Sequence, residues 1–392
     1  MTEPLQLFVP TFRVDEVLAE IRECLEKGWT GLGYKTVEIE SRWREYSGLP
    51  HAHFLNSASS GLHLAVRLLK DSEGWRDGDE VITTPLTFVS TNHAILYERL
   101  RPVFADVDEH LCLDPASVAA RMSPRTRAVM FVGFGGSPGR YAQVRALCRE
   151  RGVKLILDAA HMAGTWLGGR HAGADADVAV FSFQAVKNLP TADSGMICFA
   201  DARLDEEVRK WSWMGINKDT YARTLSSGAY KWLYDVEQIG FKYHGNSIMA
   251  AMALVGLRYL EQDNAFRRRL CDRYDEGLAG ARGIERVPVV DGCVPSRHLY
   301  QVLVDRRDET MVLLNQNGIF PGVHYRDNTL YRMYADAAGT CPRARTASES
   351  LISLPLHLRL TDTDVDRVAA TLRRIVSEAP SGLREGGPSS AP

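Results

Sequence analysis

Two residues near the middle of the chain, Asp158 and Lys187, are of types that could do chemistry together. Asp158 ends an apolar run that begins at Leu155, and Lys187 closely follows a second apolar run, residues 177–183. Such runs are typical of buried strands that deliver a polar side chain to the C-terminal edge of a parallel sheet. A carboxylate and a lysine at one edge suit pyridoxal phosphate (PLP), because the lysine can bond to the cofactor and the carboxylate can pair with its pyridinium nitrogen.

Each of the two residues has a separate task in that chemistry. A buried anion keeps the pyridine nitrogen protonated, so that the ring withdraws electrons from the reacting carbon. The lysine must be bonded to the cofactor at one stage and free at the next, when its amine moves a proton. Taken singly, Lys187 could be a solvated surface lysine and Asp158 a strand-end turn or helix cap. The two together, with the motifs below, favour the catalytic interpretation.

A candidate phosphate site comes earlier in the chain, at residues 54–66. The pattern there predicts a strand, a turn of small residues that includes Ala58 and Ser59, and then a helix. The free N–H groups and the dipole of a helix N-terminus bind phosphate, and a hydroxyl such as that of Ser59 adds a donor. Taken alone, the motif is about equally well explained as an ordinary serine-rich helix cap. Its place before Lys187 in the chain is what favours a phosphate site.

Composition argues for an enzyme without nucleic-acid or membrane partners. The chain has 392 residues, with 47 Lys and Arg against 49 Asp and Glu and a net charge of −2, which leaves no electrostatic footprint for either partner. No apolar stretch approaches a membrane span, and the first residues lack a signal peptide, so we expect a cytoplasmic protein. The 7 cysteines are scattered without a C-x-x-C pair, which predicts reduced core residues and no metal site.

The order of the elements predicts an α/β protein. Residues 1–28 form an N-terminal arm with a helix, since apolar residues recur at helical spacing from Val14 to Leu25. Strand and helix signals then alternate from about residue 54 to 199, which favours a mostly parallel sheet flanked by helices in a large PLP-binding domain, residues 29–258. A smaller C-terminal α+β domain is expected over 259–379. The tail, 380–392, is too poor in apolar residues to fold and is expected to be disordered.

Several short motifs, in order, resemble one known family. They are Gly28-Trp29-Thr30-Gly31, residues 56–63, 78–85, 87–91 and 102–108, Asp158-Ala159-Ala160-His161, residues 181–183 with Lys187-Asn188, Val323-His324-Tyr325, and residues 353–357. Each is weak alone, but together the chain from about Gly28 to Val376 resembles the sugar aminotransferases of the DegT/DnrJ/EryC1/StrS family. That resemblance implies fold type I among PLP enzymes, PLP as cofactor, and a homodimer whose active sites are shared between subunits.

The resemblance also implies roles for further residues near the cofactor. Phe88 falls where the family stacks an aromatic ring on the pyridine, although a core phenylalanine is the plain alternative. His161 matches a Gln or His near the phenolic oxygen of the cofactor. Ser182 and Ser59 match positions whose hydroxyls meet the phosphate, with Ala58 beside them.

The chain departs from the commonest family pattern at three places. Ala58-Ser59 stands where many relatives have Gly-Thr, which keeps a hydroxyl. Lys242 lies in a loop where many have Asn-Tyr-Arg, and that loop reaches the phosphate of the neighbouring subunit. Arg326 replaces the usual proline after His324-Tyr325, in a region that touches substrate. His324, Tyr325, Arg326 and Lys218 are the candidate substrate-binding residues, with Arg223 and Lys231 as further cations for a diphosphate.

The expected reaction is transfer of an amino group from L-glutamate to a nucleotide-linked ketosugar. The favoured substrate is dTDP-4-keto-6-deoxy-D-glucose, converted to the 4-amino-4,6-dideoxy sugar, as in the antibiotic-pathway relatives that the chain resembles. A 3-keto sugar and an aminocyclitol precursor of the scyllo-inosose type stay open. A sugar dehydratase of the same family would have histidine in place of Lys187. A non-catalytic regulator would normally add a basic DNA-binding helix, and none is evident before Gly28 or after Val376.

Overall fold

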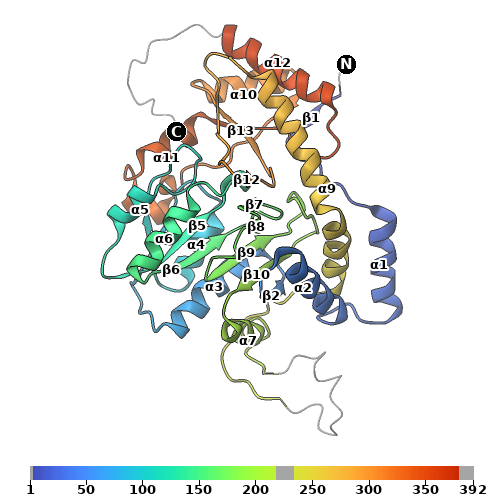
Figure 1. Ribbon diagram of the computed structural model, residues 1–392, viewed down its shortest axis with the longest axis vertical. Helices are drawn as coiled ribbons and strands as arrows, with labels where there is room; N and C mark the ends of the chain where they lie inside the picture. The colour runs from blue at the N-terminus through green and yellow to red at the C-terminus, as the bar shows by residue number, and fades with distance from the viewer. Residues whose placement is uncertain (1–2, 218–233, 379–392) are drawn as a thin grey trace.

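The protein is built around a seven-stranded, mostly parallel sheet. The structure, a computed structural model, describes residues 3–217 and 234–378 (Figure 1). β10 runs antiparallel to both of its neighbours, and the other neighbouring strands of this sheet are parallel. The predicted α/β class and mostly parallel sheet are therefore confirmed. In spatial order the strands are β2 (His51–Leu55), β10 (Gly195–Phe199), β9 (Val178–Ser182), β6 (Lys154–Asp158), β5 (Thr126–Val132), β3 (Glu80–Thr83) and β4 (Arg101–Phe104).

Both faces of this sheet are buried at its centre, which explains why a central strand such as β9 is a continuous apolar run. In β9, Val178 and Val180 pack into one hydrophobic core, while Ala179 and Phe181 pack into the core on the opposite face. Successive side chains of a strand point to opposite faces, so a strand covered on both sides has no polar positions between its ends. Polar residues are therefore left for the strand ends.

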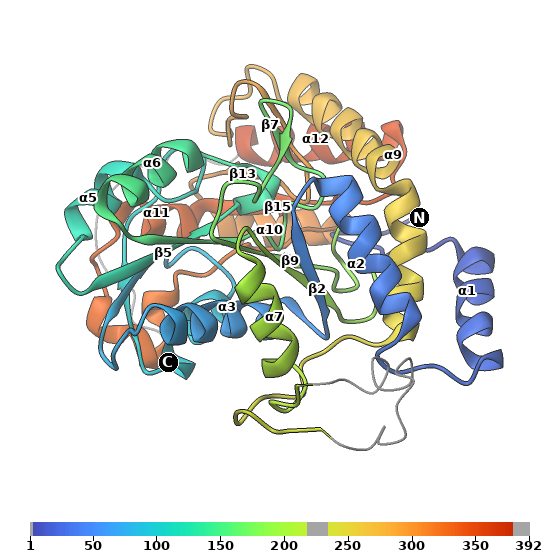
Figure 2. The ribbon, with the colours of Figure 1, turned by 60° about the horizontal axis from the view of Figure 1, so that its bottom comes forward.

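Helices cover both faces of the large sheet. α3 and α7 lie on one side of the sheet and α5 and α6 on the other (Figure 2). α2 also contributes to the core on the α6 side, through the fully buried Ile39 and Trp43. The helices of this part are α1 (Val14–Glu26), α2 (Tyr34–Ser47), α3 (Ala58–Ser72), α4 (Val89–Tyr97), α5 (Pro115–Arg121), α6 (Tyr141–Arg151) and α7 (Ala202–Trp211).

The C-terminal part has a separate core and a smaller sheet. Strands β11, β13 and β15 form an antiparallel sheet, and side chains of β13 and β15 pack with those of α9 and α12. The short strand β1 pairs in parallel with β14, which ties the N-terminal arm to this part. The bounds are α9 (Ser247–Gly277), β11 (Glu285–Arg286), β13 (Tyr300–Leu303), α10 (Arg307–Gln316), α11 (Pro342–Ser350), β15 (Leu351–Leu354), α12 (Asp362–Glu378), β1 (Leu5–Gln6) and β14 (Ile319–Phe320). A third small sheet holds β12 (Cys293–Val294), β7 (Trp166–Leu167) and β8 (Arg170–His171).

The long helix α9 connects the two parts. It is 31 residues long and runs without interruption across residues 258 and 259, where the sequence predicts the border between domains. Domain borders normally fall in exposed linkers with few contacts. The division into a large and a small domain stays a prediction, and on this geometry the two would share α9 rather than meet at a linker.

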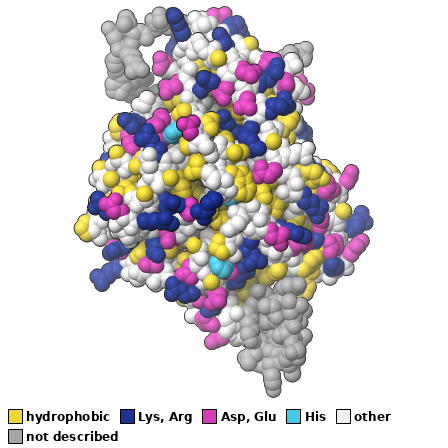
Figure 3. Space-filling model, viewed as in Figure 1, with side chains coloured by type: hydrophobic (Ala, Val, Ile, Leu, Met, Phe, Trp, Pro, Cys, Tyr) yellow, Lys and Arg dark blue, Asp and Glu magenta, His cyan; other side chains and the backbone are white. Residues whose placement is uncertain are grey.

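The surface mixes charges of both signs. On the face shown in Figure 3, Lys and Arg side chains alternate with Asp and Glu, and hydrophobic side chains lie between them. None of the helices in residues 3–217 and 234–378 has both the length and the apolar run that a bilayer crossing needs. All 7 cysteines are free thiols, and all but Cys293 are buried.

Candidate active site

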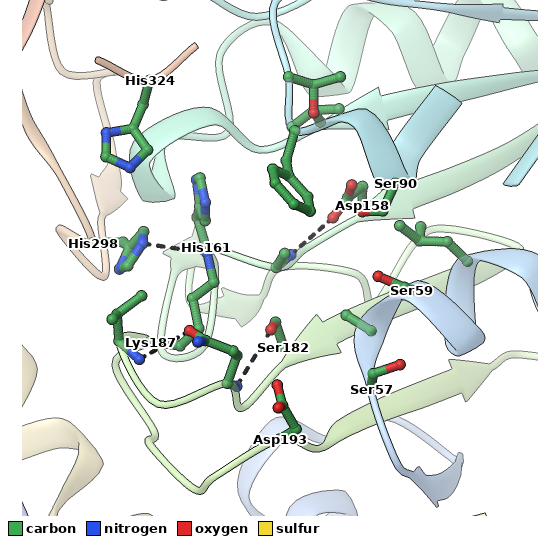
Figure 4. Close-up of a pocket in the computed structure, with 18 of the residues that line it drawn as sticks. Ser57, Ser59, Ser90, Asp158, His161, Ser182, Lys187, Asp193, His298 and His324 are labelled. Carbon is green, nitrogen blue, oxygen red and sulfur yellow. Dashed lines mark hydrogen bonds between the residues drawn. The ribbon is translucent and has the colours of Figure 1, made fainter. Parts of the chain in front are cut away.

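A cavity opens at the edge of the large sheet where β6 and β9 end. The strand register places the end of β6, the end of β9 and the start of β10 side by side at this edge. Asp158, the last residue of β6, pairs with Val180, and Ser182 pairs with Gly195 of β10. The cavity has a volume of about 420 Å³, and Lys187 and Asp158 both line it. Figure 4 shows Lys187 on one side of the cavity and Ser57 and Ser59 on the other.

Asp158 is held as an acceptor at the floor of the cavity. It is 4% exposed, and its Oδ2 accepts a hydrogen bond of 2.7 Å from the Thr91 hydroxyl, while Oδ1 accepts one of 3.1 Å from the Ala160 N–H. Thr87 in turn contacts the Thr91 hydroxyl at 2.9 Å. Burial raises the pKa of Asp158 above its ordinary value, and the two hydrogen bonds and the charge of Lys187 act against that rise.

Lys187 follows a tight turn at the end of β9. Its N–H donates to the Gln184 carbonyl at 2.8 Å, and the Gln184 side chain accepts from the Val186 N–H at 3.0 Å, which fixes the turn. The ammonium nitrogen lies 3.4 Å from Nε2 of His298. Burial lowers the pKa of Lys187 to about 8, against the charge of Asp158, which acts to raise it. About one tenth of Lys187 is therefore a neutral amine, and so a nucleophile, at pH 7, far more than for an ordinary lysine.

The N-terminus of α3 forms the opposite wall. The Ser57 hydroxyl accepts from the Ser60 N–H at 3.1 Å, so the cap serves the third residue of the helix and leaves the first N–H groups, those of Ala58 and Ser59, for a ligand. Gly195 allows this wall to approach the sheet, because a Cβ there would lie 2.7 Å from the Ala58 nitrogen. The Ser182 hydroxyl lines the same end of the cavity. Hydroxyls and helix N–H groups of this kind bind phosphate.

His161 lies between the floor and the mouth of the cavity in a single tautomer. Its Nδ1 accepts from the Gly135 N–H at 3.2 Å, so the proton of the neutral ring is on Nε2, which faces the Tyr325 hydroxyl at 3.1 Å. Gly135 has a φ of 61°, and a Cβ there would meet the Gln301 side chain at 2.8 Å. Burial lowers the pKa of His161 well below its usual value, with the nearby charges of Lys187 and His324 adding to that effect.

Phe88, His324 and Tyr325 also line the cavity. Phe88 is 57% exposed and its ring centroid is 6.1 Å from that of Tyr325. His324 bonds to the Ser353 hydroxyl through Nδ1 at 3.0 Å, and burial lowers its pKa to about 4. An exposed aromatic ring that lines the cavity can cover one face of a planar ligand, and the cofactor-stacking role expected of Phe88 stays a prediction.

Two predicted residues among those that the structure describes, Lys242 and Arg326, are not part of this cavity. Lys242 Nζ lies 3.2 Å from the centre of the Trp213 ring, and the Arg326 guanidinium lies 5.5 Å from that of Tyr331. Neither residue lines the cavity. Lys218, Arg223 and Lys231 lie outside the described residues.

The sequence interpretation missed three residues that shape the site: Thr91, Gly135 and His298. Thr91 lies in one of the family-like motifs, and a hydroxyl one helical turn after Thr87 is a weak sign of its bond to Asp158. His298 stands two residues before β13 and carries no local pattern that marks it. Gly135 is one glycine in the pair Gly135-Gly136, and only the fold shows which N–H reaches His161.

The arrangement fits PLP. It offers a buried carboxylate for the pyridine nitrogen, an amine of lowered pKa, a helix N-terminus with hydroxyls for the phosphate, and an exposed ring for one face. A cavity of this size and lining is suited to a cofactor together with part of a substrate.

The comparisons with known proteins agree with this fit. Over 95% of this chain and 99% of the other, the structure matches the aminotransferase TlmJ from Streptoalloteichus hindustanus with 34% identity and a TM-score of 0.88. It matches the sugar aminotransferase CalS13 from Micromonospora echinospora over 95% of this chain and all of the other, with 29% identity and a TM-score of 0.84. For Spr1654 from Streptococcus pneumoniae in its PLP form, the coverage is 95% and 99%, the identity 27% and the TM-score 0.86.

The fold and the cavity therefore define a fold type I, PLP-dependent aminotransferase. The sequence matches the model of the DegT/DnrJ/EryC1/StrS aminotransferase family over residues 13–373, so the chain belongs to that family and is a sugar aminotransferase. The resemblance noted in the sequence is thereby confirmed.

Proposed function

We propose that Lys187 is the lysine that bonds to PLP, that Asp158 pairs with its ring nitrogen, and that the protein aminates a nucleotide-linked ketosugar with L-glutamate. The observation that supports the residue roles most strongly is that Lys187 and Asp158 line one cavity with the N-terminus of α3 at its opposite side. His161, Phe88, Ser59, Ala58 and Ser182 line the same cavity, in keeping with the contacts expected of them.

The residues of the chain would divide the work between them. The cofactor, when bound, supplies an electron sink that makes the α-carbon of the amino donor acidic. Lys187, as a neutral amine, takes that proton on Nζ and holds it until it is delivered to the neighbouring carbon. Asp158 keeps a negative charge beside the ring nitrogen, and Thr91 and Ala160 orient its two oxygens. Amination of the sugar ketone uses the same residues in the reverse direction.

For the acceptor we propose dTDP-4-keto-6-deoxy-D-glucose, with the 4-amino-4,6-dideoxy sugar as product. The support is membership of a sugar aminotransferase family, together with residues 218–220 and 242–244, which resemble in sequence the corresponding segments of 4-aminating relatives. His324 and Tyr325 line the cavity, which supports the proposal that they contact the sugar ring.

A diphosphate needs positive charge, and the cavity has little. Among the described residues that line it, Lys187 is the single Lys or Arg. We therefore propose that the subunits form a homodimer. In that dimer, cations reach the phosphate groups from loops of the partner, which include the segment from Lys218 to Lys242, and from Arg326.

The first experiment traps the bond between Lys187 and the cofactor. Borohydride reduction should abolish the visible absorbance and leave the added mass on the peptide that contains Lys187, unless glutamate has first converted the cofactor. K154A, which removes a lysine that pairs with Glu73 and does not line the cavity, serves as the matched control and should label like the wild type. Mass on Lys154 or Lys242 would refute the assignment.

The second experiment tests the acceptor. The enzyme is incubated with glutamate and a panel of nucleotide-linked 4-keto and 3-keto sugars, free keto sugars and scyllo-inosose, and the products are identified by NMR. We expect the dTDP-4-keto sugar to be aminated and the free sugar to react poorly, because it lacks the binding energy of the nucleotide. Activity on scyllo-inosose alone would identify an aminocyclitol aminotransferase instead.

A further inference from the structure

His298 is a buried histidine that contacts the amine of Lys187 and has no role in the reaction as described above. It lies two residues before β13, is 2% exposed, and forms part of the wall on the Lys187 side of the cavity (Figure 4). Its ring is stacked against Phe8, with centroids 5.4 Å apart and planes at 8°, and it is tilted by 41° to the His161 ring, with centroids 4.4 Å apart. These two neighbours fix the plane of the imidazole.

The hydrogen bonds of Asn188 fix which ring nitrogen carries the proton. Nδ2 of Asn188 donates to Oδ1 of Asn264 and to the Ser296 carbonyl, both at 2.7 Å, so both amide hydrogens are used. The remaining atom, Oδ1, is an acceptor only, and it lies 3.1 Å from Nδ1 of His298. Nδ1 therefore donates to Asn188, and in the neutral ring the lone pair is on Nε2.

That lone pair faces Lys187, since Nε2 is 3.4 Å from Nζ. The ring is kept neutral, because burial lowers the pKa of His298 well below its usual value and nearby positive charges add to the effect. Groups around the pair that carry or can take a charge are Asp158, His161, Lys187, Arg267 and His324. Of these, only Asp158 is an acid, and it acts to raise the pKa of Lys187.

We propose that His298 is a positioning residue for Lys187: its Nε2 accepts one N–H of the free amine and turns the Nζ lone pair toward the α-carbon of the amino donor. The proposal rests on the assignment of Lys187 made above. An unrestrained amine can rotate about its C–N bond, and only some of its orientations aim the lone pair at the reacting carbon. One fixed N–H contact reduces that freedom, which is the kind of orientation that speeds proton transfer.

The contact also has a consequence in the enzyme without cofactor. A neutral acceptor binds an ammonium more strongly than an amine, so His298 favours the charged form of Lys187. Removing the acceptor should therefore lower the pKa of Lys187 by about one unit, the size expected of one hydrogen bond to a charged group. This shift can be measured without any turnover.

Two substitutions separate the two nitrogens of the ring. In H298N the amide stands near Nδ1 and can keep the bond to Asn188, but nothing replaces Nε2. In H298Q the longer side chain can place an oxygen near Nε2, which restores the acceptor for Lys187. Thermal unfolding of both variants, compared with wild type, shows whether each is folded.

The pKa of Lys187 is measured in the cofactor-free chain from the pH dependence of its acetylation, followed by peptide mass spectrometry. We expect about 8 in wild type, a value about one unit lower in H298N, and recovery in H298Q. In the loaded enzyme, kcat for the glutamate half-reaction should fall about 10- to 100-fold in H298N with little change in KM, and H298Q should recover most of it.

Equal pKa values for Lys187 in folded H298N and wild type would overturn the proposal, as would equal loss of kcat in both variants. Borohydride labelling is carried out in parallel on all three proteins. Mass on a lysine other than Lys187 would refute the assignment of the cofactor lysine, whereas mass on Lys187 with no effect of H298N would refute the role of His298 alone.

Discussion

The two ends of the cofactor cavity differ in how much of their chemistry this chain supplies. At the end near Asp158, the carboxylate is buried and both of its oxygens accept hydrogen bonds from residues of the same chain. At the end formed by the N-terminus of α3, Ser59 is exposed and the donors are hydroxyls and N–H groups, with no Lys or Arg besides Lys187 among the described lining residues.

The difference shows which parts of a cofactor site one edge of a sheet can supply without a second chain. A carboxylate that meets a protonated ring nitrogen needs burial and orientation, which a strand end and a neighbouring helix provide. A phosphate group carries up to two negative charges. Neutral hydrogen-bond donors can orient the group, but they do not neutralise those charges. We therefore expect changes near Asp158 to alter the rate of the chemistry and changes near Ser59 to alter the affinity for the cofactor.

The largest effect should come from the substitution D158N. It keeps the shape but removes the anion that holds the ring nitrogen protonated, so the rate of the glutamate half-reaction should fall about a thousandfold or more. The cofactor should still bind, because the phosphate end is unchanged. Stopped-flow absorbance gives the rate, and equilibrium titration gives the affinity.

T91V is the matched control for D158N, since it removes one hydrogen bond to Asp158 and keeps the charge. Its rate should fall far less. A D158N enzyme with near-normal turnover would show that Asp158 is structural and would remove the contrast between the two ends.

A smaller effect is expected at the phosphate end. S59A removes one hydroxyl donor and should weaken PLP binding about 10- to 100-fold, as expected for one hydrogen bond to a charged group, with little change in the half-reaction rate at saturating cofactor. S90A, which removes a hydroxyl elsewhere in the cavity lining, is the control. A slower half-reaction without a change in affinity would contradict the division of tasks.

The smallest effect should be the pH dependence of cofactor loading. Lys187 reacts with the aldehyde only as a neutral amine, and burial lowers its pKa to about 8. The loading rate should therefore rise with pH, about fivefold from pH 7 to pH 8, and level off above pH 9. In D158N the profile should move to lower pH, because the charge of Asp158 acts to raise the pKa of Lys187. A profile that is flat between pH 7 and pH 9 would contradict this prediction.

The amino-acid sequence by itself determined the elements and the ends at which chemistry occurs. Apolar runs that end in Asp158 and Ser182 specify strands buried on both faces, and the parallel arrangement of such strands brings their ends to one edge. The serine-rich turn before residue 60 likewise specifies a helix N-terminus at that edge. These features are local, since each depends on the pattern of about ten consecutive residues.

Only the tertiary structure decided which groups complete the site. The bond from Thr91 to Asp158 joins residues 67 positions apart, that from Gly135 to His161 spans 26, and the contact between Lys187 and His298 spans 111. No local pattern encodes such pairs, because they arise when separately formed elements pack and their side chains meet. Tertiary packing also decided where Lys242 and Arg326 lie. Their charged groups lie near the rings of Trp213 and Tyr331, and neither residue lines the cavity. The spacing of apolar residues determines which face of a helix or strand is buried and where the element ends. Packing between distant segments determines which side chains that element then contacts.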